Sequence, residues 1–140
     1  MDVGRSAFLR VHIIVINTGT ELLLADVLNT HLAFIAREIL PLDLRIDRQL
    51  TVPDGAAIRE ALTESFHFAD IIFVTGGLGP TTDDITRELT ADLLRLELRN
   101  DPGVMAAIKE RFAARGYKWT VRIARQANVP VIAPAIAGLW

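Results

Sequence analysis

The chain has 140 residues and no cysteine, and its 15 Lys and Arg face 17 Asp and Glu, which gives a formal charge of −2. This length fits one domain with its own core, and the lack of cysteine excludes disulfides, thiolate metal sites and a cysteine nucleophile. Without cysteine nothing points to an oxidising compartment, so we expect a cytoplasmic protein. The net charge offers no basic surface for nucleic acids or anionic membranes, so we expect neither as a partner.

Hydrophobic residues make up 51% of the chain. Charged residues nevertheless interrupt each apolar run well before the about 20 residues that a membrane helix needs. Residues 1–10 carry Asp2 and no apolar run, so they are expected to be a loose lead-in and not a signal peptide. Apolar surface of this amount favours an interface, and we expect a homo-oligomer.

Strands and helices are predicted in alternation from the start. A β-branched run over residues 11–16 predicts a strand buried on both faces. Apolar residues at helical spacing predict one helix from Glu21 to about Leu40, which Pro41 ends. Alternating apolar and polar residues over 44–50 predict an edge strand before a turn.

The middle of the chain repeats this order. Ile58, Leu62 and Phe66 share one face of a second predicted helix, and residues 71–74 form a wholly apolar strand. That strand runs directly into a glycine-rich turn over residues 75–80. The glycines therefore lie at the carboxyl end of a strand.

Two further helices and a short strand complete the pattern. Apolar residues between 85 and 96 mark the third helix, those from 104 to Gly116 mark the fourth, and residues 129–132 mark a last strand. Strands that alternate with helices predict an α/β fold with a mostly parallel sheet covered on both faces. We expect one domain over residues 11–140.

The glycine-rich turn is the first candidate site. Ligands of open α/β sheets bind beyond the carboxyl ends of the strands, so the turns at Gly19, Asp54 and residues 76–80 are expected on one rim. Glycine amides that lead into a helix offer a nest for phosphate, although a glycine turn alone is equally consistent with structural punctuation. No lysine occurs between the turn and Leu96, which excludes a Walker loop, and Thr82 replaces the third glycine of a dinucleotide fingerprint.

Two aspartates on this rim are candidate metal ligands. Asp84 follows the glycine turn and Asp54 precedes the second helix, and Mg²⁺ prefers one or two carboxylates with water and phosphate oxygens. The structural alternatives remain open at this point. Thr81 and Asp84 have the spacing of a helix capping box, and Asp54 has the position of an N-cap.

A third segment of the rim is Gly19-Thr20-Glu21. Thr20 can cap the first helix and Glu21 lies at the positive end of its dipole, so a structural role suffices and a ligand wall is the alternative. No Ser-His-Asp pattern or His and Asp metal cluster has useful spacing in the sequence.

Taken together, three segments resemble the signatures of the molybdopterin-binding domain. They are Gly19-Thr20-Glu21-Leu22-Leu23, Thr51-Val52-Pro53-Asp54 and Thr75-Gly76-Gly77-Leu78-Gly79-Pro80-Thr81-Thr82-Asp83-Asp84-Ile85-Thr86. The last is highly specific, and with Arg125-Gln126-Ala127 it resembles the amino-terminal domain of the CinA-like competence/damage-inducible proteins more than the molybdenum-cofactor enzymes. The resemblance covers about residues 11–127.

This resemblance implies a three-layer αβα sandwich with its ligand rim at the glycine turn. It implies that Asp54 and Asp84 serve Mg²⁺-dependent handling of nucleotide or molybdopterin phosphates, and in the CinA-like branch hydrolysis of ADP-ribose-type pyrophosphates. Molybdopterin adenylyl transfer and a non-catalytic binding module for phosphate-bearing small molecules are the alternatives. The candidate binding residues are Gly19, Thr20, Glu21, Thr75, Gly76, Gly77, Leu78, Gly79, Pro80, Thr81, Thr82 and Asp83.

The sequence departs from the family in two places. Ala25 stands where glycine is usual, and Asn29-Thr30-His31 replaces Asp-Thr-Asn, which alters the wall of the pocket beside the first helix. Residues 133–138 stand where the family has an Asn-Pro-x-Gly-Thr-Ala-Pro-Gly-like turn. We therefore expect a carboxyl end that is shorter than the family's.

Overall fold

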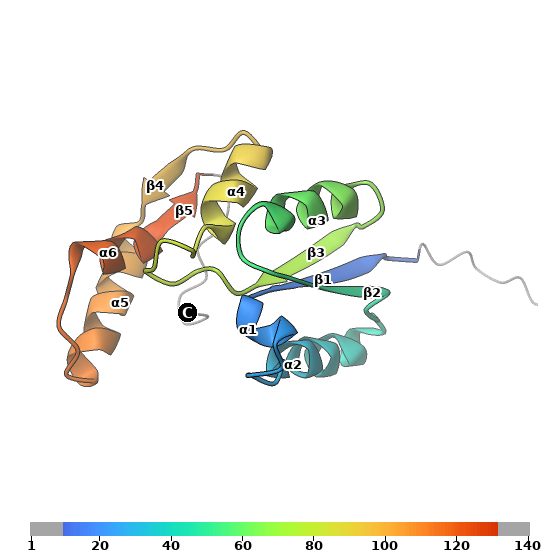
Figure 1. Cartoon of the computed structure of the whole chain (residues 1–140), viewed down its shortest axis with the longest axis horizontal. Coiled ribbons are helices and arrows are strands. Elements are labelled where there is room, and N and C mark those ends of the chain that lie inside the picture. The colour runs from blue at the N-terminus through green and yellow to red at the C-terminus, as the bar shows by residue number, and fades with distance from the viewer. Residues whose placement is uncertain (1–9, 132–140) are drawn as a thin grey trace, which may run out of the picture.

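Three parallel strands form the centre of the computed structural model, which describes residues 10–131 (Figure 1). They are β1 (Ile13–Thr18), β2 (Arg48–Val52) and β3 (Ile71–Thr75), in the order β2-β1-β3. Every residue of β1 is buried, as predicted for a strand covered on both faces. The strand predicted over residues 44–50 lies at the edge of the sheet as expected, but it begins only at Arg48 and ends at Val52.

Helices cover both faces of this sheet. The helix α3 (Ala56–Phe66) packs Ile58 and Leu62 against Ile14 and Ile16 of β1. Figure 1 shows α1 (Thr20–Leu23) and α2 (Thr30–Ile39) on the opposite side of the sheet. The predicted α/β fold class, with a parallel sheet between helices, is confirmed.

The prediction of one helix from Glu21 to Leu40 is wrong, because the chain breaks between α1 and α2. Ala25 has a φ of 59°, a left-handed conformation that no α-helix contains. Asn29 then caps α2, since its side chain accepts a hydrogen bond from the amide of Leu32 at 3.3 Å. A short 3₁₀ helix, η1 (Leu40–Leu42), continues from α2 through Pro41.

The carboxyl-terminal part of the described chain has a core of its own. After α4 (Thr86–Leu93) come β4 (Leu98–Asn100), α5 (Pro102–Ala114), α6 (Val121–Ala124), η2 (Arg125–Ala127) and β5 (Asn128–Pro130). Val104 and Ile108 of α5 pack against Ile123 and Ala127, apart from the cluster around Leu62. We call residues 98–130 the β4–β5 unit.

The last predicted strand exists as β5, but it does not belong to the parallel sheet. It pairs antiparallel with β4 in a separate two-stranded sheet, so the described sheets are not all parallel. Three-residue β4 and four-residue α6 were not predicted, because they are too short to show a period. The predicted strand residue Ile132 and the departures at residues 133–138 lie outside the described residues.

No helix within residues 10–131 has the length and apolar character needed to cross a membrane.

Asp47 fixes the start of β1 and gives the fold a pH dependence. Its carboxylate accepts a hydrogen bond from the amide of Ile13 at 2.9 Å, and this bond, with the Arg10 guanidinium, lowers the pKa of Asp47. A lowered pKa contributes stability above the ordinary value of about 3.9 and loses it as pH falls through the folded value. We expect the urea midpoint to fall less steeply below about pH 4 in Asp47→Asn than in the parent chain. Parallel midpoint curves for the two proteins would contradict this role.

Candidate functional site

The glycine turn packs tightly against the end of β1. Gly76 and Gly77 have φ values of 91° and 63°, which side chains rarely adopt. A Cβ on Gly76 would lie 2.1 Å from the backbone oxygen of Thr18, and one on Gly77 would lie 2.1 Å from Oγ1 of Thr86. Both glycines are therefore required by close contacts within the chain.

Two threonine hydroxyls lie beneath this turn. Thr18 and Thr86 are each 3% exposed, and their Oγ1 atoms have no hydrogen-bond partner within the described residues. Thr18 was not among the candidates predicted from the sequence, and Thr86 was included only as part of the family signature. The base of the turn is thus polar, and its hydroxyls keep their hydrogen-bonding capacity.

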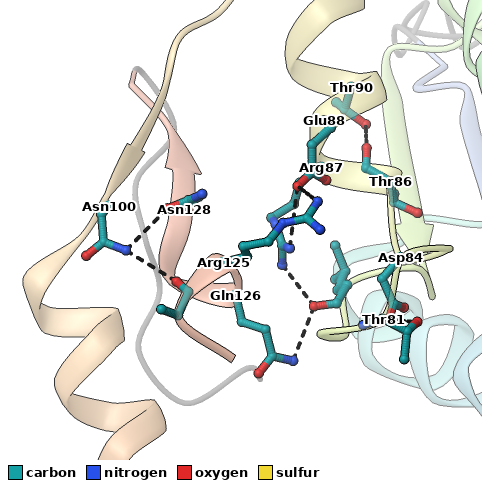
Figure 2. Close-up of polar contacts among 12 residues, drawn as sticks. Thr81, Asp84, Thr86, Arg87, Glu88, Thr90, Asn100, Arg125, Gln126 and Asn128 are labelled. Carbon is teal, nitrogen blue, oxygen red and sulfur yellow. Dashed lines mark hydrogen bonds and ion pairs between the residues drawn. The ribbon is translucent and has the colours of Figure 1, made fainter. Parts of the chain in front are cut away.

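Asp84 lies against the amides of the same turn (Figure 2). Its Oδ2 accepts hydrogen bonds from the Thr81 amide at 2.8 Å and from the Thr81 hydroxyl. Partial burial acts to raise the pKa of Asp84, but the bonds from Thr81 and the Gly79 amide, with the charge of Arg87, outweigh it and lower that pKa. Asp84 is therefore a carboxylate at neutral pH.

The capping-box interpretation of Asp84 is wrong for the helix, although its local hydrogen bond exists. The helix α4 begins at Thr86, and its N-cap, Ile85, makes no side-chain bond. Asp84 instead closes the turn, because a Cβ on Gly79 would lie 2.5 Å from its Oδ2. The position of the Asp84 carboxylate and the conformation of residues 79–81 therefore depend on each other.

Asp54, in the turn after β2, is hydrogen-bonded to the turn that follows β1. Its Oδ2 accepts hydrogen bonds from the amide and the hydroxyl of Thr20, at 3.2 and 3.3 Å. The N-cap interpretation of Asp54 is wrong, because Gly55 is the N-cap of α3 and makes no side-chain bond. Thr20 likewise does not cap α1, since Gly19 holds that position. The carboxyl of Glu21 lies over Gly19, where a Cβ would meet it at 2.4 Å.

The remaining candidates occupy the edges of the turn. Thr75 ends β3, and its hydroxyl accepts a hydrogen bond at 2.7 Å from the buried side chain of Asn17. Leu78 and Pro80 are half-buried, whereas Thr82 and Asp83 are exposed. Within residues 10–131, no group of three or more His, Cys, Asp or Glu side chains is placed to hold a metal ion. The structure therefore offers two separate rim carboxylates and no closed metal cage among the described residues.

A buried arginine, missed in the sequence analysis, supports the turn from behind (Figure 2). Arg87 is 5% exposed and donates from Nη1 to the carbonyl of Leu78 at 2.9 Å. Burial lowers the pKa of the Arg87 guanidinium. The negative charge of Glu88 acts to raise this pKa, and the positive charge of Arg125 acts to lower it. Arg125 binds Glu88 at 2.9 Å, and Gln126 donates to the same Leu78 carbonyl at 3.4 Å. These contacts connect the β4–β5 unit to the glycine turn.

A known protein family and known relatives match the part of the chain that contains the three rim segments. The chain matches the probable molybdopterin binding domain family over residues 14–138. A CinA-like protein of Akkermansia muciniphila is 40% identical over 121 residues, which are 86% of this chain and 29% of that protein. A protein of Moorella thermoacetica named as competence-damage inducible is 42% identical over 85% of this chain and 29% of its own length. The chain thus spans less than a third of these two relatives.

Solved structures agree on the fold. CinA of Thermoplasma acidophilum, whose function is described as unknown, superposes with a TM-score of 0.74 at 30% identity over 87% of this chain and 72% of its own. The molybdopterin biosynthesis Mog protein of Mycobacterium ulcerans superposes at 0.58 with 23% identity over 75% of this chain and 68% of its own, a likeness of fold alone. The chain therefore belongs to the molybdopterin-binding domain family, among its CinA-like members.

Proposed function

We propose that the glycine-turn rim binds a nucleotide diphosphate or a pterin phosphate and hydrolyses ADP-ribose-type pyrophosphates with a divalent metal. One observation carries the metal requirement. The ionised carboxylate of Asp84 accepts hydrogen bonds from the amides of Gly79 and Thr81, in the same turn whose Gly76 and Gly77 amides would receive a phosphate. Two anions at one turn repel each other, so a phosphate at this rim needs a cation beside it.

The rim residues fit a hard divalent cation. Thr20 binds Oδ2 of Asp54 and leaves its Oδ1 for a metal, whereas the carboxylate of Asp84 would be shared between Thr81, the Gly79 amide and a metal. Mg²⁺ commonly takes one or two carboxylates and completes its shell with water and phosphate oxygens. When bound, the metal would supply Lewis-acid polarisation of a phosphoryl oxygen and bring water close to it.

The chain's own residues would hold the substrate. The amides of Gly76 and Gly77 and the start of α4 are the proposed donors to one phosphate, and the dipole of α4 adds to their attraction. Asp54, tied to Thr20, would fix the distance between the first and second turns of the rim. These donors stabilise charge that develops on the phosphoryl oxygens.

Two other functions use the same rim. Molybdopterin adenylyl transfer would need the same carboxylates and is the second candidate enzyme activity. A non-catalytic binding module is the third, and the apolar side chains exposed on α1, α2 and the segment between them support assembly with a second copy. Leu24, Leu28 and Phe34 are 66%, 85% and 59% exposed there.

The test is phosphorus NMR of ADP-ribose incubated with the purified chain and Mg²⁺. We expect monophosphate signals with the parent chain and a rate about 100-fold lower with Asp84→Asn, since one electrostatic group at a reacting phosphate has about this effect. Asp70→Asn is the matched control, because Asp70 also accepts a backbone hydrogen bond, from His12 at 2.8 Å, but at the opposite end of the sheet. Binding of ADP-ribose without turnover by the folded chain would favour the binding module.

A further inference from the structure

The outer side of the glycine turn is held by two side chains from different elements. Arg87 of α4 and Gln126 of η2 both donate to the carbonyl oxygen of Leu78, at 2.9 and 3.4 Å (Figure 2). The carbonyl has two lone pairs, so both bonds can form together. The peptide that joins Leu78 to Gly79 is thus fixed from its carbonyl side.

Fixing this carbonyl also fixes the amide of Gly79. A trans peptide is planar, and its C=O and N–H point in opposite directions. With the Leu78 oxygen directed to Arg87, the Gly79 amide is directed to the other side of the turn, where it meets Asp84. The direction of the amide that holds Asp84 therefore depends on Arg87, which lies behind the turn.

Arg87 is not explained by its contribution to the stability of the fold. Its Nε and Nη2 atoms are buried and have no hydrogen-bond partner among the described residues. Unsatisfied buried donors are unfavourable, and a charged group makes this worse. The ion pair with Glu88 is long, at 4.0 Å, whereas Glu88 is already bound by Arg125 at 2.9 Å.

We propose that Arg87 is a positioning residue for the glycine turn, which sets the direction of the 78–79 peptide through its hydrogen bond to Leu78. The proposal deepens the function proposed above and rests on it for the ligand, but the orientation itself is present without a ligand. Gln126 is the second support, supplied by the β4–β5 unit. Substitution of Arg87 by an apolar residue should then weaken ligand binding without lowering the stability of the fold.

The experiment compares Arg87→Met, Arg87→Lys and the control Arg122→Met, an exposed arginine on α6. Methionine is apolar and of similar length, it removes two buried donors that have no partner among the described residues, and Glu88 keeps its ion pair with Arg125, so the midpoint of unfolding should stay equal or rise. In the same variant the Leu78 carbonyl ¹³C and Gly79 amide resonances should shift, and the dissociation constant for ADP-ribose with Mg²⁺ should rise about tenfold. Arg87→Lys keeps a cationic donor and should return the two resonances and the dissociation constant most of the way to their values in the parent chain.

Three results separate the possible failures. Unchanged Leu78 and Gly79 resonances in Arg87→Met would overturn the positioning role whether or not any ligand binds. A fall in the unfolding midpoint together with weaker binding would also overturn it, because it would show an ordinary structural residue. If the parent chain binds no ADP-ribose, the proposed function fails, yet shifted resonances in Arg87→Met that Arg87→Lys restores would still support the positioning role.

Discussion

Gly76→Ala should lower the free energy of unfolding by about 3 kcal/mol or more, because the new methyl group has no space and the backbone no relaxed alternative. The Cβ would lie 2.1 Å from the backbone oxygen of Thr18 and 2.6 Å from its hydroxyl. Thr18 belongs to the fully buried β1 and cannot move aside without disturbing the sheet. Urea denaturation followed by circular dichroism measures the loss.

Gly55→Ala is the matched control for this substitution. Gly55 also has a positive φ, 104° against 91° at Gly76, but a Cβ there would meet nothing within 4 Å. It should show the backbone strain alone, about 1–2 kcal/mol. Equal losses at the two glycines would mean that the contact with Thr18 contributes nothing.

Leu62→Ala should be the second most damaging change, with a loss of about 3 kcal/mol. Leu62 is 1% exposed and belongs to the cluster formed with Ile14, Ile16 and Ile58 between α3 and the sheet. Its removal loses buried apolar surface and leaves a cavity that rigid β1 cannot close. The same urea titration gives this value.

Phe66→Ala tests whether burial or size sets the loss. Phe66 lies one turn further along the same helix and is larger than Leu62, but it is 43% exposed. Its substitution should cost about 1 kcal/mol, since much of its surface already contacts water. A loss at Phe66 that equals or exceeds the loss at Leu62 would contradict the described core.

Long apolar patterns were the part of the fold that could be predicted from sequence. The run that became β1 is buried on both sides, and Ile58 and Leu62 repeat at the spacing of one helix face. The break between α1 and α2 could not be predicted from periodicity, because the apolar residues continue through it at helical spacing. Asn29 followed by Thr30 was the available sign of a new helix start.

The rim could be predicted in part for a different reason. Glycines and aspartates directly after strands are read from residue type alone, so the turn and both carboxylates were identified as candidates. Burial of Thr18 and Arg87 depends on contacts with distant segments, which a single sequence does not display. The role of Asp54 shows the same limit, because Thr20, its partner, lies 34 positions away in the chain.

The two separate cores have a mechanical consequence. Within residues 10–131 no buried residue belongs to both clusters, and Arg125 and Gln126 of the β4–β5 unit make polar contacts with α4 and the glycine turn. Such contacts exchange for water at small net cost, whereas an apolar contact does not. The helix α4, which follows the glycine turn, packs Leu89 and Leu93 against the cluster around Leu62, so the turn belongs to that core and the chain passes to the other core only after Leu93. We therefore expect the β4–β5 unit to separate from the sheet more readily than either core unfolds, and the glycine turn would then lose the support of Gln126.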